Sequence, residues 1–225
     1  MSVSEAERRS EAGAVRLVLA TRNRHKLAEL TRILSATGLD VGLASLDAFP
    51  VVPEVAETGV TFEENALLKA RAIARFTRLP AVADDSGICV SVLNDMPGPF
   101  SAIWSGRHGD DEANLNVLLG QLADVPPDRR AAHFTCVAAL VIPGPGGTER
   151  VVEGQLDGRL TQAPRGENGF GYDPVFVPDG DDRTTAEMAP EEKDAISHRG
   201  RAFRALAREI ADLLRGERLL PAEGR

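Results

Sequence analysis

Residues 15–44 read VRLVLATRNRHKLAELTRILSATGLDVGLA, and the order of patterns in this stretch decides the fold class. Residues 15–20 form a short apolar run rich in Val and Leu, which is typical of a buried strand. After a polar turn at 21–25, apolar residues recur on one helical face, at Leu27, Leu30, Ile33 and Leu34. Gly38 ends this helix, and residues 41–44 form a second strand. A strand, a helix and a second strand in this order predict an α/β fold.

Outward from this stretch, helical and strand patterns continue to alternate. Thr61 with Glu64 forms a capping box, which starts a helix at about residue 62. Ser197 is the expected N-cap of the last helix, whose inward face carries Phe203, Leu206, Ile210, Leu213 and Leu214. The patterns predict helices over 62–77, 110–123 and 197–215, and strands over 81–83, 89–93, 131–142, 149–156 and 174–177.

These elements fit one α/β domain with an elongated mixed central sheet flanked by helices, folded as two lobes with a central active-site cleft. We expect this domain to span residues 14–216. Residues 1–13 are polar and charged, and they predict a disordered N-terminal extension. Residues 217–225 are expected to form a C-terminal tail.

The composition limits the partners and the setting of the chain. A formal net charge of −8 over 225 residues argues against a protein that coats nucleic acid. It is compatible with a small anionic substrate, because a few basic residues in a cleft can override the overall sign. Residues 1–13 lack the apolar core of a secretory signal, and the longest apolar run, 136–142, is too short to span a bilayer. We therefore expect a cytoplasmic protein with no membrane partner, in which Cys89 and Cys136 are reduced core residues.

The segment TRNRHK, residues 21–26, is the first candidate site because it lies between a strand and a helix. A helix N-terminus offers unpaired N–H groups and a partial positive charge, which suits a phosphate group. Thr21 and Asn23 can add side-chain hydrogen bonds, and Lys26 can add a point charge. A solvated basic helix start with a Thr or Asn cap explains the same residues. The segment is not a Walker A loop, because the chain has no GxxxxGK[ST] motif.

The segment DDSG, residues 84–87, is the second candidate. Two adjacent carboxylates at the end of a buried strand are costly unless something compensates their charge. Mg²⁺ does so well, because it takes one or two carboxylates together with phosphate oxygens. Glu57 is a possible partner carboxylate. The alternative is a plain turn capped by Asp and Ser, with Glu57 as a solvated loop acid.

Two aromatic residues in a glycine-rich loop, residues 166–174, make the third candidate. Phe170 and Tyr172 lose hydrophobic stabilisation there unless they pack on something, and a planar base is a suitable partner. The glycines let the backbone approach a ligand closely. The alternative is a loop folded back on its own core.

Basic residues near the last helix are the fourth candidate. With Ser197 as N-cap, His198 and Arg199 are expected to point outward at the first turn, where a cation is mildly unfavourable for the helix dipole. Together with Lys193 they could read the C6 oxygen of a purine, as Arg reads guanine O6 in DNA. The alternative is that these residues, like Lys69 in the helix over 62–77, are ordinary surface residues.

Read together, five motifs occur in a fixed order: LVLATRNRHKLAEL, ETGVTFEENALLKA, ADDSGICVSVLNDMPGPFSAIWSG, ENGFGYDPVFVP and EKDAISHRGRAF. The chain closely resembles the inosine/xanthosine triphosphate pyrophosphatase (HAM1-like) family from about Arg16 to Leu214. The resemblance implies hydrolysis of ITP, dITP and XTP to the monophosphate and pyrophosphate, which removes damaged purines from the nucleotide pool. It also implies an elongated mixed sheet with a central cleft and a homodimer.

The resemblance also implies roles for individual residues. The triphosphate would be bound by Thr21, Arg22, Asn23, Arg24, His25 and Lys26, and reached by Lys69. Mg²⁺ would be held by Glu57 and Asp85, with Asp85 also accepting the proton of the attacking water. Ser86 would contact substrate. The base and sugar would be lined by Phe170, Gly171, Tyr172 and Asp173, and the base would be recognised by Lys193, His198 and Arg199.

The chain departs from the family pattern at a few positions. Ile103 stands where the family often has Arg, Asp194 stands where Asn is common, and Asn94 and Asp95 lie where Gly is frequent. None of these touches the proposed metal carboxylates. Two other functions stay open: a nucleotide pyrophosphatase with another base preference, and a regulator that binds a triphosphate without cutting it.

Overall fold

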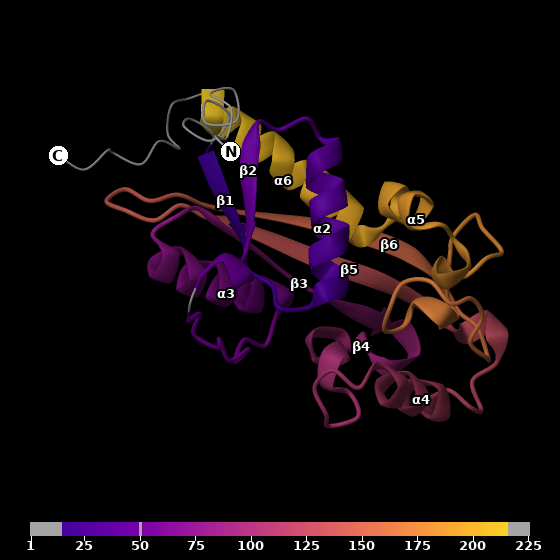
Figure 1. Ribbon diagram of the computed structural model, residues 1–225. Coiled ribbons are helices and arrows are strands. Elements are labelled where there is room, and N and C mark those ends of the chain that lie inside the picture. Colours follow the sequence, from indigo (N-terminus) through magenta and orange to yellow (C-terminus); the bar gives the residue numbers. More distant parts are fainter. Residues whose placement is uncertain (1–14, 50, 216–225) are drawn as a thin grey trace, which may run out of the picture.

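The computed structural model describes residues 15–49 and 51–215 (Figure 1). The expected N-terminal extension and C-terminal tail lie outside these residues. The strands are β1 (Val15–Leu19), β2 (Val41–Ser45), β3 (Ala81–Val90), β4 (Met96–Pro97), β5 (Ala131–Val141), β6 (Glu149–Leu160) and β7 (Phe176–Pro178). The α-helices are α2 (Arg24–Ala36), α3 (Phe62–Thr77), α4 (Asp111–Gln121), α5 (Pro190–Ile196) and α6 (His198–Arg215). None of these helices combines the length and the apolar composition needed to cross a bilayer.

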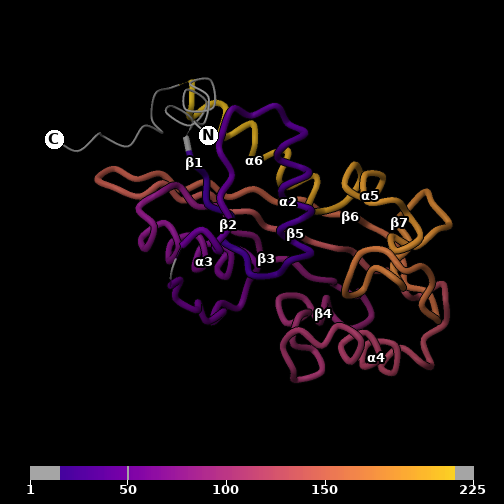
Figure 2. Tube along the Cα trace, in the orientation of Figure 1, coloured from indigo at the N-terminus to yellow at the C-terminus, as the bar shows by residue number. Residues whose placement is uncertain are grey.

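One mixed sheet runs through the molecule in the strand order β2-β1-β3-β5-β6-β7, with β4 also paired to β3. β1 is parallel to β2 and β3, because helical crossovers connect these strands. β5 and β6 form a long antiparallel hairpin, which extends along most of the molecule in Figure 2. The expectation of an elongated mixed sheet flanked by helices is therefore confirmed.

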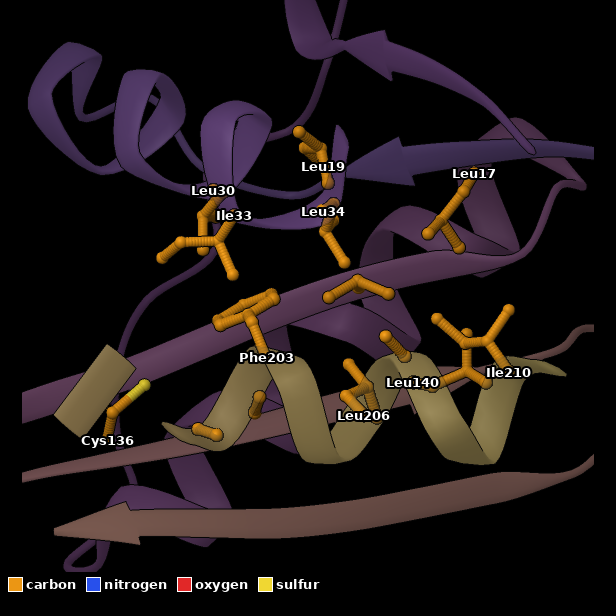
Figure 3. Close-up of a cluster of buried hydrophobic side chains, with 14 of the residues drawn as sticks. Leu17, Leu19, Leu30, Ile33, Leu34, Cys136, Leu140, Phe203, Leu206 and Ile210 are labelled. Atoms are coloured by element: carbon orange, nitrogen blue, oxygen red, sulfur yellow. The ribbon is translucent and has the colours of Figure 1, made fainter. Parts of the chain in front are cut away.

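The helices cover the sheet on both faces. α2 and α6 pack on one face, and α3 packs on the other (Figure 1). Figure 3 shows Leu30 and Ile33 of α2 meeting Phe203 and Leu206 of α6, beside Leu140 of β5. These helix residues are the ones that the 3.6-residue periodicity assigned to inward faces. Burial of each such side chain contributes roughly 1.5–3 kcal/mol.

A second apolar cluster forms at the other end of the sheet. Leu115 and Leu118 of α4 pack there with Phe134 of β5, Leu156 of β6 and Phe176 of β7. The strands β3, β5 and β6 pass through both clusters and connect the two ends of the molecule. The middle of β3 lies at the junction between these ends.

Several elements differ from the sequence prediction. The predicted strands 81–83 and 89–93 are one strand, because the polar residues Asp84 and Asp85 keep pairing with β5 across the interruption in apolar pattern. β6 extends to Leu160, with buried and exposed residues alternating through its second half. The predicted strand 174–177 begins only at Phe176, after a 3-10 turn over Asp173–Val175. The short helix α5 and the strand β4 were missed.

The capping prediction at α3 is confirmed in part. Thr61 is the N-cap, and its hydroxyl oxygen accepts a hydrogen bond from Glu64 N at 3.1 Å. The Glu64 carboxylate, however, accepts from Val60 N at 2.7 Å rather than from Thr61 N. Both cysteines are free and buried, as expected for small core residues.

Candidate active site

The site begins at a gap along one edge of β3. β1 pairs with β3 only at Ala81 and Val82, and β4 pairs with it only at Cys89 and Val90. No described strand pairs with residues 83–88 on this side, whereas β5 pairs with all of β3 on the other. Side chains from both faces of the sheet can therefore reach one opening, because no strand separates them there.

Asp84 lies on the face of the sheet covered by α2 and α6. Its Oδ2 atom is 2.9 Å from Lys26 Nζ and 3.5 Å from Arg199 Nη2, and it accepts a 3.2 Å hydrogen bond from Ser86 Oγ. Burial alone would raise the pKa of Asp84, but the charges of Lys26, Arg199 and Lys69 outweigh it and hold the pKa well below its usual range. Asp84 is therefore an ionised carboxylate with basic partners.

Asp85 points to the opposite face, toward α3, because side chains alternate along a strand. Its Oδ2 accepts a 3.1 Å hydrogen bond from Asn65 Nδ2, and its Oδ1 is 3.4 Å from Lys69 Nζ. Burial raises the pKa of Asp85, and Lys69 and Lys26 offset this only in part. The two adjacent carboxylates thus have opposite pKa shifts, which suits Asp85 better for accepting a proton.

Glu57 reaches the same place from the loop before α3. Lys69 Nζ lies 2.9 Å from Glu57 Oε1, so this ammonium sits between Glu57 and Asp85. Burial disfavours the charged form of Lys69, but Asp85, Asp84 and Glu57 together raise its pKa.

The alternative prediction that residues 84–87 form a turn is wrong, since these residues lie within β3.

The carboxylates fit a hard divalent cation. The carboxylate oxygens of Glu57 and Asp85 both contact the ammonium group of Lys69, so both face a position that suits a cation. Asp84 Oδ1 is buried without a hydrogen-bond partner among the described residues. Within residues 15–49 and 51–215, no three acidic, His or Cys side chains form a complete metal site. This donor set resembles Mg²⁺ sites, in which one or two carboxylates act together with substrate phosphate oxygens.

The start of α2 forms another wall of the cleft. Asn23 is the N-cap, and its side-chain oxygen accepts from His25 N at 2.9 Å and Lys26 N at 3.1 Å. Thr21 Oγ1 accepts from Asn23 N at 3.2 Å, so both predicted phosphate-binding side chains already shape the turn. Arg22 donates a 2.7 Å hydrogen bond to the Val52 carbonyl, which ties this turn to the loop that carries Glu57.

Residues 170–173 of the glycine-rich loop form a further wall of the cleft. The Phe170 ring stacks on His25 with centroids 5.4 Å apart, and Lys193 Nζ and Arg199 Cζ lie 5.3 and 5.5 Å from its centroid. Tyr172 is instead buried in the second apolar cluster, and its hydroxyl donates to the Ser101 carbonyl at 2.8 Å. The two aromatic residues therefore differ: Phe170 is half-buried beside basic side chains at the cleft, whereas Tyr172 is buried in the apolar cluster.

A buried network of charges lies behind Phe170. Lys193 Nζ is 2.9 Å from Glu29 Oε1 and 2.5 Å from Asp173 Oδ2, and Arg199 pairs with the other oxygen of Glu29. Arg199 also donates a 2.7 Å hydrogen bond to Ser86 Oγ, which joins this network to β3. Burial would raise the pKa of Glu29, but Arg199 and Lys193 lower it below its usual range.

The prediction that His198 and Arg199 point outward is wrong. Both are buried, because α5 and α6 meet at Ser197 and turn these side chains toward β3 and β5. The His198 ring stacks on Phe134 with centroids 4.7 Å apart, and its Nδ1 has no hydrogen-bond partner among the described residues. Burial, and then Arg199 and Lys193, lower the pKa of His198 well below 6.5. The ring is therefore neutral in the folded protein.

One cleft brings together most of the residues singled out from the sequence. Its lining includes Thr21, Arg22, Asn23, Lys26, Glu57, Lys69, Asp84, Asp85, Ser86, Phe170, Gly171, Tyr172, Asp173, Lys193, His198 and Arg199. Arg24 and His25 do not line it, and His25 lies in a smaller groove behind Phe170. The sequence reasoning missed Glu29 and Asn65, although each is a polar residue next to apolar positions of an inward helix face, which is a usable signal.

The departures from the family pattern have local explanations. Asn94 and Asp95 both adopt a left-handed backbone, with φ of 51° and 61°, the conformation that favours glycine. Asp194 is buried and accepts a 2.8 Å hydrogen bond from Arg32 Nε. Ile103 is 42% exposed and does not line the cleft.

The fold and the cleft define an α/β protein whose cleft combines carboxylates, basic side chains and aromatic rings. A model of the Ham1 family matches residues 17–209. A dITP/XTP pyrophosphatase of Streptomyces coelicolor is 61% identical over 199 residues, which are 88% of this chain and 98% of that relative. A dITP/XTP pyrophosphatase of Mycobacteroides abscessus is 53% identical over 208 residues, 92% of this chain and 100% of that relative. The chain belongs to the Ham1 family.

Solved structures agree with this assignment. A HAM1 protein from Coxiella burnetii superposes with a TM-score of 0.79 at 40% sequence identity, over 88% of this chain and 99% of that one. A nucleoside-triphosphatase, or dITP/XTP pyrophosphatase, from Mycobacterium abscessus has a TM-score of 0.68 at 55% identity, over 85% of this chain and 98% of that one.

Proposed function

We propose that this chain hydrolyses the non-canonical purine nucleoside triphosphates ITP, dITP and XTP to the monophosphate and pyrophosphate. The observation that carries this proposal is the juxtaposition of Asp85, Lys69 and Glu57 in one cleft with Lys193 and Arg199, which are held by the buried Glu29. One set of groups suits phosphates and the other suits a polar base edge. The relatives named dITP/XTP pyrophosphatase support the same reaction.

We further propose that Glu57 and Asp85 hold Mg²⁺ with the substrate phosphates. Both carboxylates contact the Lys69 ammonium, and this shared cationic neighbour supports the proposal. When bound, the ion neutralises phosphate charge and makes the phosphorus more electrophilic.

The chain's own residues would then divide the remaining work. Lys26 and Lys69 are paired with Asp84 and Asp85, and the same ammonium groups can donate hydrogen bonds to phosphate oxygens. Water attacks the α-phosphorus in line with the leaving pyrophosphate, and Asp85 accepts its proton. Asp84 stays ionised beside Lys26 and Arg199 and holds these cations in place.

Recognition of the base follows from hydrogen-bond polarity. Hypoxanthine and xanthine carry an acceptor oxygen at C6, which Lys193 or Arg199 can bind while Phe170 stacks on the ring. Adenine carries an amino donor at C6, and two facing donors leave both groups unpaired in a buried site. Such a mismatch costs about 1–3 kcal/mol. Guanine shares the C6 oxygen, so its rejection depends on the 2-amino side.

The family resemblance and the composition also support two wider proposals. We infer a homodimer that acts in the cytoplasm on the nucleotide pool, with no nucleic-acid or membrane partner. Size-exclusion chromatography with light scattering tests the dimer directly, and a monomer at assay concentrations would refute it.

Product analysis tests the proposed reaction. With ITP and Mg²⁺ we expect equal amounts of IMP and pyrophosphate, and a panel of common and deaminated triphosphates should show preference for ITP, dITP and XTP. Release of inorganic phosphate would refute the proposed bond cleavage. Tight binding of ITP without Mg²⁺-dependent turnover would favour a nucleotide-binding regulator, and faster turnover of a modified pyrimidine triphosphate would change the substrate class.

A further inference from the structure

We propose that Asn65 is a positioning residue that holds Asp85 and the Glu57 loop in one arrangement; this inference rests on the proposed function. The Asn65 side chain is almost fully buried, with 2% of its surface exposed. Its Nδ2 donates to Asp85 Oδ2 at 3.1 Å, and its Oδ1 accepts from Gly59 N at 2.8 Å. One amide thus connects Asp85, the proposed proton acceptor, to the loop that carries Glu57, the other proposed metal ligand.

The bond to Asp85 fixes which carboxylate oxygen faces the cleft. Asn65 and Lys69 are one turn apart on α3, so both reach Asp85 from the same helix face. Asn65 takes Oδ2, and Oδ1 is left beside Lys69 on the side of Glu57. Without the amide donor, the carboxylate could rotate and present neither oxygen consistently to metal or water.

The bond to Gly59 fixes the loop. A Cβ atom at Gly59 would lie 2.6 Å from Glu64 Cβ and 2.7 Å from Asn65 Oδ1, so this backbone must pack directly against the start of α3. The neighbouring Val60 N donates to Glu64 Oε2 at 2.7 Å and adds a second attachment of the loop to α3. Glu57 lies two residues before Gly59, so its position depends on this attachment.

The chain contains a matched control in Asn114. Asn65 and Asn114 are each the fourth residue of their helix, and both are buried. Asn114 accepts from Ser105 N at 2.7 Å and donates to the Ala102 carbonyl at 3.1 Å. Its bonds therefore copy those of Asn65 in number and length, except that its acceptor is a backbone carbonyl rather than a carboxylate of the site.

The test compares Asn65→Ala with Asn114→Ala in kcat and KM for ITP, in the Mg²⁺ concentration for half-maximal rate, and in thermal stability. Mn²⁺ binding to the nucleotide-free protein, followed by electron paramagnetic resonance, adds a measurement that needs no turnover. We expect similar losses of Tm. Only Asn65→Ala should lower kcat or metal affinity, by about 10–100-fold, as loss of a residue behind a metal ligand does. KM for ITP should change less than kcat.

An isosteric variant covers the case in which Asn65→Ala fails to fold. Asn65→Asp keeps the acceptor for Gly59 but cannot donate to Asp85 when ionised, and its kcat should fall as well. Equal effects of Asn65→Ala and Asn114→Ala on kcat and metal affinity would overturn the inference, as would wild-type kcat in Asn65→Asp. Absence of ITP turnover in the wild-type protein would instead refute the proposed function, and Mn²⁺ binding would then decide the role of Asn65.

Discussion

Lys69 Nζ lies 3.4 Å from Asp85 Oδ1 while it also contacts Glu57, so a side-chain ammonium lies between the two carboxylates proposed to bind metal. Through these contacts the lysine neutralises the acidic groups. When substrate and metal arrive, the same lysine can move to a phosphate oxygen. Under the mechanism proposed above, phosphate and metal therefore depend on each other for binding.

Asp85→Asn removes the proposed proton acceptor and one metal ligand with little change in shape. We expect kcat for ITP to fall by at least about a hundredfold, since a positioned general base contributes about 10²–10⁴-fold. The melting temperature should stay close to that of the wild-type protein, because the asparagine keeps its volume and can still hydrogen-bond. A variant that folds and turns over ITP at nearly the wild-type rate would remove Asp85 from the mechanism.

Lys69→Met removes the cation that competes with metal for Glu57 and Asp85. Mn²⁺ should bind the nucleotide-free variant more tightly than the wild-type protein, by roughly tenfold, or about 1.4 kcal/mol. Turnover of ITP should fall, because a phosphate ligand is lost. The matched control is Arg71→Met on the same helix, whose partner Glu149 lies outside the cleft lining. Equal Mn²⁺ affinity in the wild-type protein and both variants would show that Lys69 does not compete with metal.

Arg199→Ala should narrow the preference for ITP over ATP, because the base loses a donor for its C6 oxygen. The ratio of kcat/KM for ITP to kcat/KM for ATP should fall by an amount equivalent to about 1–3 kcal/mol of discrimination free energy. Arg199→Ala also removes a buried partner of Glu29 and so lowers the stability of the protein. Breaking a buried ion pair in this way costs about 3–5 kcal/mol of stability. The ratio of the two kcat/KM values is still informative, because it does not depend on the fraction of protein that is folded. An unchanged ratio would exclude Arg199 from base recognition.

His198 makes the stability of the protein depend on pH. Its pKa is well below 6.5 in the folded state, so below pH 6.5 the unfolded chain takes up a proton that the folded protein does not. The free energy of unfolding therefore decreases as pH falls from 6.5 toward the folded pKa, by up to about 1.4 kcal/mol per pH unit. Chemical unfolding between pH 5 and 7 should show a shallower slope for His198→Gln. Identical slopes in variant and wild type would mean that His198 titrates alike in both states.

The predictions from the sequence are correct for elements whose apolar residues follow a single, uninterrupted periodic pattern. The inward faces of α2 and α6 are correct because Leu30, Ile33, Phe203 and Leu206 obey a single helical repeat. β3 was divided in two because charged residues in mid-strand break the apolar pattern, although hydrogen bonding to β5 does not depend on side-chain polarity. Short elements such as α5 carry too few residues to show a period.

The candidate site was predictable as a set of residues but not as an arrangement. Motif order pointed to Asp85, Lys69 and Phe170, and these line one cleft. Burial of His198 and Arg199 could not be predicted, because it depends on how α5 and α6 meet around Ser197. The partners of Glu29 lie 164 and 170 residues away along the chain, so no local pattern contains that contact.

The position of water attack tests the central claim most directly. Turnover of ITP in ¹⁸O-labelled water, followed by mass spectrometry of both products, locates the oxygen that enters. Attack at the α-phosphorus places the label in IMP and leaves pyrophosphate unlabelled, which is the result expected here. Label in pyrophosphate and unlabelled IMP would mean attack at the β-phosphorus, and the proposed geometry around Asp85 would then be wrong.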